Sequence, residues 1–250
     1  MAHATHLTVD QGNSTVGAVA WSVEGDQARV LGRYEGLDTI PAGLQELAGP
    51  VLLSSVADQA RRATLVDALE LRFGAVVVPD HGLALAIRHP ETCGLDRLFA
   101  TRAAAGLFPP GAVVVDCGTA LTVDVVRDGT FEGGAIAPGP ALLVRALAEG
   151  GAQLHTVEAR PGAPALGRET REALEAGVVV GLRGAARELV LCQLAELDLP
   201  TLPVVVTGGA RSLLLEPTTC LPGEVHERPD LVHEGLLLAG LQGIRLPELS

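Results

Sequence analysis

The chain has 250 residues, of which 48% are hydrophobic and 19% are charged, so it can build a folded core and is not of the disordered class. Its formal net charge is −12 and it contains no lysine, which argues against nucleic acid as a partner and excludes a Walker A lysine or a Schiff base. No apolar stretch has the roughly 18 residues of a membrane span, and no signal peptide is visible, so we expect a cytoplasmic protein without a membrane partner.

The first element is a strand that ends in the segment Val9–Ser14. Gly12 follows Asp10 by two positions, and a glycine there lets the backbone amides come close to an anion. A carboxylate beside a phosphate needs a cation between them, so Asp10 predicts Mg²⁺, bound directly or through water. Asn13, Ser14 and Thr15 add neutral donors. One such turn is weak evidence, because most turns of this kind only join two strands.

The next segments alternate between strand and helix. A second strand runs to a hairpin turn at Glu24-Gly25-Asp26. Pro50–Val56 and Ala75–Pro79 have the apolar runs of buried strands, and residues 57–73 between them have apolar positions at helical spacing. This alternation predicts an α/β fold with helices on the faces of a sheet.

A proline-bounded loop, His89–Arg97, leads into a helix that should begin near Asp96. Asp96 then either caps that helix, with Arg97 in solvent, or serves as a carboxylate base beside an arginine that holds a substrate carboxylate. The residues alone leave both interpretations open.

The strand-turn pattern returns at Val115–Thr122, which begins 106 positions after Val9. It leads to a hairpin signal at Asp128-Gly129. A repeat of this size indicates a duplicated domain rather than a solenoid. We therefore expect two similar α/β domains with mixed sheets, residues 1–108 and 109–250.

The second half continues with the glycine-rich segment Phe131–Pro140, which either lines a pocket or is a tight strand-to-helix connection. Helices are predicted over residues 140–149 and 170–197, and a final helix over 233–243. A buried strand, Leu202–Val206, ends in Thr207-Gly208-Gly209, a third glycine turn.

The order of these motifs resembles that of the type III pantothenate kinases. The motifs are D-x-G-N-S, P-x-x-x-G-x-D-R, D-x-G-T-A-x-T, G-G-x-I-x-P-G, G-x-x-T and T-G-G, and they extend from about residue 7 to residue 241. The resemblance implies a duplicated actin-like (ribonuclease H-like) fold, a homodimer with the active site near its interface, and ATP-dependent phosphorylation of pantothenate, the first step towards coenzyme A.

The resemblance also implies a role for each motif. The first turn holds the ATP phosphates: Asp10, Gln11, Gly12, Asn13, Ser14, Thr15, Val16 and Gly17. Pantothenate contacts Gly94, Leu95, Asp96 and Arg97, with Asp96 as the proton acceptor and Arg97 on the substrate carboxylate. Asp116 binds a monovalent cation, K⁺ or NH₄⁺, and Thr119 contacts ATP. Thr170 contacts pantothenate across the dimer interface, although on its own it also reads as a helix N-cap.

The sequence departs from the family at two positions. Ile87 stands where a tyrosine is usual, and His89 stands where an asparagine precedes the loop proline. Two other functions stay open: an actin-like kinase of another small hydroxylated acid or sugar, and a catalytically silent regulator that only binds the nucleotide.

Overall fold

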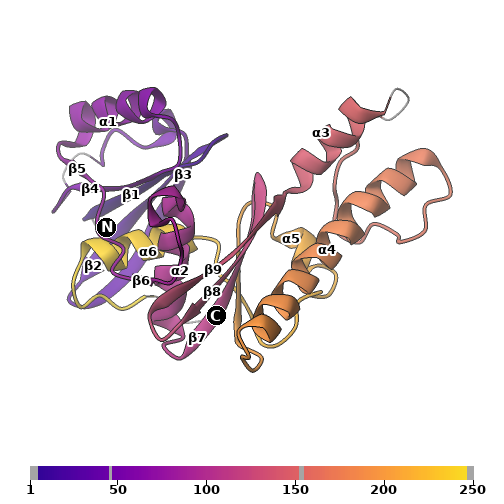
Figure 1. Ribbon diagram of the computed structural model, residues 1–250. Helices are drawn as coiled ribbons and strands as arrows, with labels where there is room; N and C mark the ends of the chain where they lie inside the picture. The colour runs from indigo at the N-terminus through magenta and orange to yellow at the C-terminus, as the bar shows by residue number, and fades with distance from the viewer. Residues whose placement is uncertain (1–4, 45–46, 152–154, 247–250) are drawn as a thin grey trace. The chain divides into compact units, whose positions relative to one another are not determined.

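The computed structural model describes residues 5–44, 47–151 and 155–246 (Figure 1). Two compact units divide the chain. The first consists of Met1–Pro109, Asp128–Phe131 and Asp230–Ser250, and the second of Pro110–Arg127 and Glu132–Pro229. Both are α/β, as predicted. The division into two similar domains, residues 1–108 and 109–250, stays a prediction.

The first unit holds these elements: β1 (His6–Gln11), β2 (Val16–Glu24), β3 (Gln27–Glu35), η1 (Leu37–Thr39), β4 (Val51–Ser55), α1 (Gln59–Phe73), β5 (Val76–Val77), β6 (Ala84–Leu85), η2 (Pro90–Thr92), α2 (Leu95–Leu107) and α6 (Leu231–Gly240). The order β3-β2-β1-β4-β5 forms a five-stranded sheet. It is mixed, since β1 pairs antiparallel with β2 and parallel with β4.

Alternation along the strands gives this sheet two apolar faces. Ala18 and Ala20 of β2 pack on one face with Leu65 and Leu69 of α1. Trp21 of β2 packs on the other face with Leu237 of α6. Because successive strand residues point to opposite faces, one strand serves both layers, and Figure 1 shows α1 and α6 on opposite sides of the sheet.

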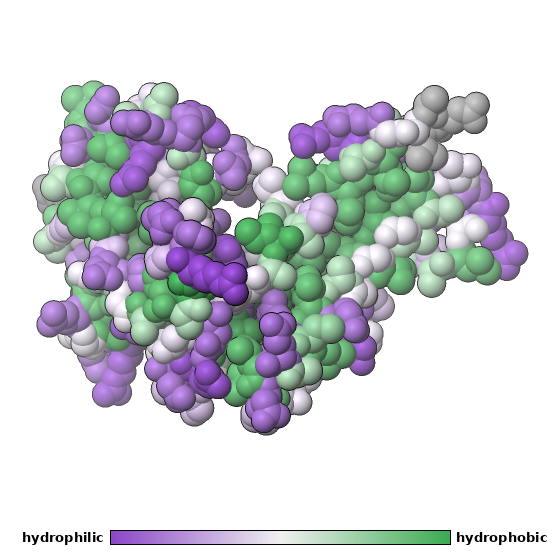
Figure 2. Space-filling model, in the orientation of Figure 1, coloured by the Kyte–Doolittle hydropathy of each residue, from purple (hydrophilic) through white to green (hydrophobic). Residues whose placement is uncertain are grey.

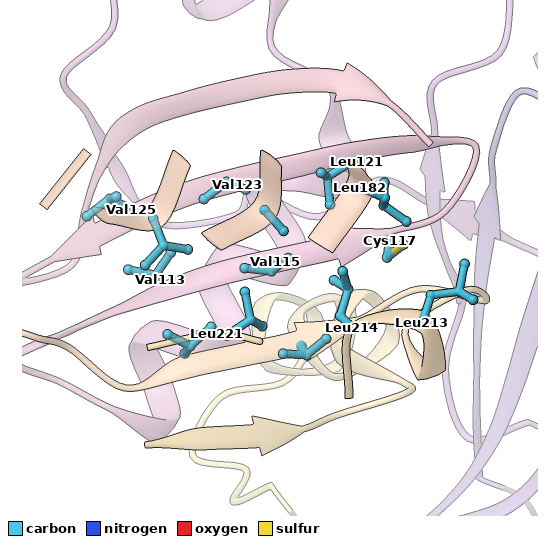
Figure 3. Packing of buried hydrophobic residues seen from close by; sticks show 14 of the residues in the cluster. Val113, Val115, Cys117, Leu121, Val123, Val125, Leu182, Leu213, Leu214 and Leu221 are labelled. Atoms are coloured by element: carbon cyan, nitrogen blue, oxygen red, sulfur yellow. The ribbon is translucent and has the colours of Figure 1, made fainter. Parts of the chain in front are cut away.

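The second unit holds β7 (Gly111–Cys117), β8 (Ala120–Arg127), α3 (Pro140–Gly150), α4 (Thr170–Glu196), β10 (Val204–Thr207), α5 (Ser212–Leu215) and β11 (Val225–Glu227), and β9 (Thr130–Pro138) begins in the first unit and continues here. Its sheet is also mixed: β7 pairs antiparallel with β8 and parallel with β10. Figure 3 shows the core, in which Val115, Val123 and Leu182 come from β7, β8 and α4.

The predicted helices are confirmed within a few residues. The segment 57–73 is α1, which starts after the N-cap Asp58 and ends at Gly74, and the segment 170–197 is α4. The last helix, α6, begins at Leu231 and ends at Gly240, earlier than predicted at both ends. Both hairpin turns form, and Asp128 and Gly129 have φ values of 48° and 71°.

One buried strand was predicted wrongly. Ala75–Pro79 forms only the two-residue β5, and Val77 is 44% exposed. The reason is its position at the edge of the sheet, where β4 is its single neighbour. In the ranges described above, none of the helices combines the length and hydropathy required to cross a bilayer.

Candidate functional site

The first glycine turn lies between β1 and β2. Gly12 N donates to the carbonyl oxygen of Thr15 at 2.9 Å and closes the turn. Asn13, Ser14 and Thr15 are exposed on it. The backbone of the turn is therefore tight, while its polar groups remain accessible to a ligand.

Asp10 lies at the base of this turn, in register with Ser54 of β4. Burial raises the pKa of Asp10 to about 6, and the charge of Asp96 adds to that shift; the nearby Ser54 hydroxyl opposes it without reaching hydrogen-bond geometry. The buried atom Asp10 Oδ1 has no hydrogen-bond partner among the described residues, and neither does Ser54 Oγ. A buried carboxylate oxygen without a donor fits a cation or a metal-bound water.

Asp96 lies in the first turn of α2. Its Oδ1 accepts a hydrogen bond from Arg97 N at 2.8 Å. A Cβ added at Gly94 would come within 2.5 Å of that oxygen, so glycine leaves the space that the carboxylate occupies. Burial raises the pKa of Asp96, and the amide and charge of Arg97 oppose the shift. The N-cap of α2 is Gly94, so the interpretation of Asp96 as the cap is wrong.

The neighbours of Asp96 complete this segment. Leu95 is the first residue of α2. The Arg97 guanidinium carbon lies 5.5 Å from the centre of the Phe131 ring, which is a cation–π distance. Ile87 is half-buried, and the exposed His89 pairs with Glu91 at 3.3 Å. The first unit thus brings together Asp10, Gly94 and Asp96, which the sequence predicted as site residues.

The second glycine turn lies in the second unit, where the third glycine turn packs directly on it. Asp116 is in register with Thr207, the last residue of β10. Gly208 has a φ of +92°, and a Cβ there would collide with the Asp116 carboxylate and the backbone of Cys117. Ala210 N donates to the Cys117 carbonyl at 2.8 Å. The T-G-G segment is therefore part of the same site as Asp116.

The end of β9 and the residue after it, Gly139, pack against the second glycine turn. Gly139 N donates to the carbonyl of Thr119 at 3.1 Å, and a Cβ at Gly139 would collide with the backbone of Gly118 and Thr119. Pro140 then begins α3. The glycines of the segment Phe131–Pro140 therefore serve a close approach to the second turn, and Thr119 itself remains exposed.

A cavity of about 690 Å³ lies beside the third glycine turn, within the second unit. Val144 and Ala148 of α3 line one side, and Gly209, Ala210 and Leu213 line the other. A partly apolar pocket of this size suits a small organic group. Two of its lining residues, Pro140 and Gly209, belong to glycine-rich segments that the sequence analysis singled out, whereas Val144, Ala148 and Leu213 carry no motif that could have been recognised.

Thr170 is the first residue of α4 and lines a second cavity, of about 600 Å³, with His155 and Leu174. The N-cap is Glu169, so Thr170 is not the cap. Glu172 in the first turn accepts a hydrogen bond from Arg168 N at 2.7 Å. Thr170 and Asp96 belong to different units.

In the part of the chain that the structure describes, no three His, Cys, Asp or Glu side chains gather as a metal site. Asp10 and Asp116 are single carboxylates at glycine turns. A divalent ion held at Asp10 would need further oxygen ligands, and the phosphates of a bound nucleotide supply such ligands.

Sequence comparisons bear on this arrangement. The profile of the family described as Type III pantothenate kinase matches residues 6–191. The chain is 37% identical over 166 residues to the Type III pantothenate kinase of Thermomicrobium roseum, covering 66% of this chain and 62% of that protein. It is 40% identical over 149 residues to that of Thermobifida fusca, covering 58% and 57%. The chain thus spans less than two thirds of the length of these relatives.

Solved structures share the fold. A Campylobacter jejuni protein described as a Baf family transcriptional activator aligns with a TM-score of 0.55 and 20% identity, covering 92% of this chain and 96% of that one. A Sinorhizobium meliloti protein described as a 2-dehydro-3-deoxygalactonokinase aligns with a TM-score of 0.51 and 15% identity, covering 94% and 98%. These likenesses concern the fold alone, and they agree with the predicted duplicated actin-like architecture.

Proposed function

Because the chain belongs to the type III pantothenate kinase family, we propose that it transfers the γ-phosphoryl group of ATP to the primary hydroxyl of pantothenate, giving 4′-phosphopantothenate. The observation that carries the proposal is the carboxylate of Asp96. It is fixed by the Arg97 amide, has a raised pKa and lies close enough to Asp10 to influence its charge. In protein kinases, which also phosphorylate a hydroxyl, a positioned aspartate accepts the proton of that hydroxyl.

In this proposal Asp96 accepts the proton of the attacking hydroxyl. A raised pKa makes a carboxylate a better proton acceptor, provided that it is ionised at the working pH. Arg97, with Gly94 and Leu95, holds the substrate, and its guanidinium binds the pantothenate carboxylate. The ring of Phe131 restricts where that guanidinium lies, which supports a positioning role.

The first turn, Asp10–Gly17, binds the ATP phosphates through its amides and its exposed side chains. Asp10 holds Mg²⁺ or a metal-bound water with its unpartnered Oδ1. When bound, Mg²⁺ neutralises negative charge on the phosphate oxygens. Asp10 is therefore the residue that links the turn to the metal, and Asp96 keeps the role of base.

The second turn binds the nucleotide with Thr119. Its Asp116 holds a monovalent cation, K⁺ or NH₄⁺, which supplies positive charge near the phosphates in a chain without lysine. The cavity between α3 and Gly209–Leu213 takes the base of the nucleotide, since it adjoins the same turn and has apolar walls.

We further propose a homodimer formed through α4. Three glycines and a valine share one exposed face of this helix at positions 177, 180, 181 and 184, and Val180 is 42% exposed. Glycine in a helix interior costs about 1 kcal/mol of helix stability relative to alanine. Close packing of a partner helix against these positions, which have no side chain, would offset that cost. Figure 2 shows hydrophobic residues gathered over α3 and α4. Thr170 then contacts pantothenate across the interface.

One experiment distinguishes the proposed function from the two alternatives, an actin-like kinase of another acceptor and a catalytically silent regulator. Purified protein is incubated with ATP, Mg²⁺ and K⁺, and ADP release is followed with pantothenate and with a panel of small hydroxylated acids and sugars. Pantothenate-dependent release supports the proposal. Release with another acceptor alone identifies a different actin-like kinase. ATP binding without release on any acceptor identifies a silent regulator.

A further inference from the structure

Arg61, near the start of α1, reaches the first glycine turn from another part of the chain. Its Nη1 donates to the carbonyl oxygen of Asn13 at 3.0 Å, across 48 positions in the sequence. The Arg61 backbone is fixed on two sides: its amide donates to Asp58 Oδ1 at 3.0 Å, and its carbonyl accepts from Gln11 Nε2 at 3.3 Å.

Gln11 ties this arrangement to the sheet. It is 4% exposed, and its Oε1 accepts a hydrogen bond from Ser55 Oγ at 2.8 Å. Gln11 is the middle residue of the D-x-G pattern, so the turn and the first turn of α1 are held by one buried side chain. These hydrogen bonds hold the backbone of Arg61 at a defined position relative to the turn.

The guanidinium of Arg61 still has capacity for a ligand. It has five N–H donors, and the described residues give it one acceptor, the Asn13 carbonyl. The side chain is exposed, and none of the described carboxylates forms an ion pair with it. Its planar donor set matches two oxygens of a phosphate at once.

We propose that Arg61 binds the polyphosphate of the nucleotide at the first glycine turn and supplies fixed positive charge there, in a chain that has no lysine. This inference rests on the proposed function, since it assigns a further phosphate-binding residue to the same site. Arg61 does not touch the acceptor hydroxyl in this account. Its effect should appear in binding of the phosphates and not in binding of pantothenate.

The test uses Arg61→Ala and Arg61→Lys, with Arg62→Ala as the matched control, because Arg62 is the exposed neighbour and its one described contact is the bond from its backbone amide to Asp58. Dissociation constants are measured by calorimetry for ATP, AMP and inorganic tripolyphosphate, and KM is measured for ATP and pantothenate. Trp21 is the one tryptophan, and its fluorescence checks folding of each variant.

Arg61→Ala should weaken ATP and tripolyphosphate roughly tenfold or more, the scale of a hydrogen bond to a charged group. AMP affinity and the KM for pantothenate should not change, Arg61→Lys should recover part of the loss, and Arg62→Ala should match the wild type. Unchanged tripolyphosphate binding in Arg61→Ala overturns the inference. So does an equal loss for AMP and ATP, which would mean that Arg61 only braces the turn, and so does a lysine variant no better than alanine.

The outcome is separate from that of the proposed function. If the wild type shows no pantothenate-dependent ADP release, the proposed function fails. Tripolyphosphate binding needs no turnover, so it still decides whether Arg61 is a phosphate ligand.

Discussion

The carboxylate of Asp96 raises the pKa of Asp10, because the two groups lie close together within the first unit. One belongs to the end of β1 and the other to the first turn of α2, 86 positions apart in the sequence. Burial raises the pKa of each as well. This pair links the phosphate turn to the proposed base. Because the pKa of each carboxyl group is raised, ionisation of Asp10 should lower the stability of the unliganded protein.

Asp10→Asn should therefore stabilise the unliganded protein at neutral and higher pH. The pKa of Asp10 is about 6 in the folded state against 3.8 for the ordinary group, so the folded state holds its proton more tightly and loses stability as pH rises through that window. Removing the charge should raise the free energy of unfolding by about 1–3 kcal/mol at pH values above about 7. Denaturant unfolding measured across pH checks this.

The gain should vanish below the ordinary pKa of 3.8, where both states are protonated. The control is Asp67→Asn, which replaces an exposed aspartate on α1 and is measured under the same conditions. A variant at Asp10 that is less stable than the wild type at high pH would contradict the account of its burial.

Local signals predicted much of this fold. The N-cap Asp58 and the C-terminal Gly74 mark the ends of α1, and the two Asp-x-Gly turns lie where the strand pattern put them. The exposure of β5 could not be predicted, since a short apolar run has the same composition at the centre and at the edge of a sheet. Sheet order depends on pairing between distant segments.

The site shows the same limit. The role of Asp10 could be proposed from the turn chemistry, and that of Asp116 from the family resemblance. The need for Gly208 could not be predicted, because it arises from the contact of β7 with β10. The bond from Arg61 to Asn13 also joins distant segments, and Arg61 has no motif around it. Residues such as Gly208 and Arg61, whose importance follows from tertiary contacts, could not be identified from the sequence.

Gly208→Ala should damage the second site more than Gly209→Ala. Gly208 has a φ of +92° and no room for a Cβ beside Asp116, whereas a Cβ at Gly209 would meet nothing within 4 Å. A strained backbone of this kind costs about 1–3 kcal/mol. We expect a lower Tm and weaker ATP binding for Gly208→Ala. Equal behaviour of the two variants would show that the T-G-G turn does not hold the Asp116 carboxylate in place.

ADP formation should be faster with K⁺ or NH₄⁺ than with Na⁺ at equal ionic strength, since Asp116 is the proposed monovalent-cation ligand. Asp116→Asn should lose this difference between salts, because it removes the negative charge that attracts the ion. Initial rates in matched chloride salts provide the measurement. Equal wild-type rates in all three salts would remove the cation from the proposal.

Gly181→Glu should dissociate the proposed dimer without unfolding the chain. The position is exposed on α4 and has open space around it, and glutamate favours helix more than glycine does. Sedimentation velocity should show a shift from dimer to monomer, with an unchanged circular dichroism spectrum. Ala63→Glu, at an exposed site on α1, is the control and should leave the assembly intact. A monomeric wild type would contradict the dimer.

The most direct test of the central claim is detection of the phosphorylated product by phosphorus NMR, with ATP, Mg²⁺, K⁺ and pantothenate, for the wild type and Asp96→Asn. The wild type should form 4′-phosphopantothenate, and kcat should rise with pH as Asp96 ionises above its ordinary pKa of 3.8. Asp96→Asn should lower kcat roughly 10²-fold or more, the scale of general-base loss. Wild-type turnover in Asp96→Asn, or no phosphorylated pantothenate from the wild type, would contradict the account.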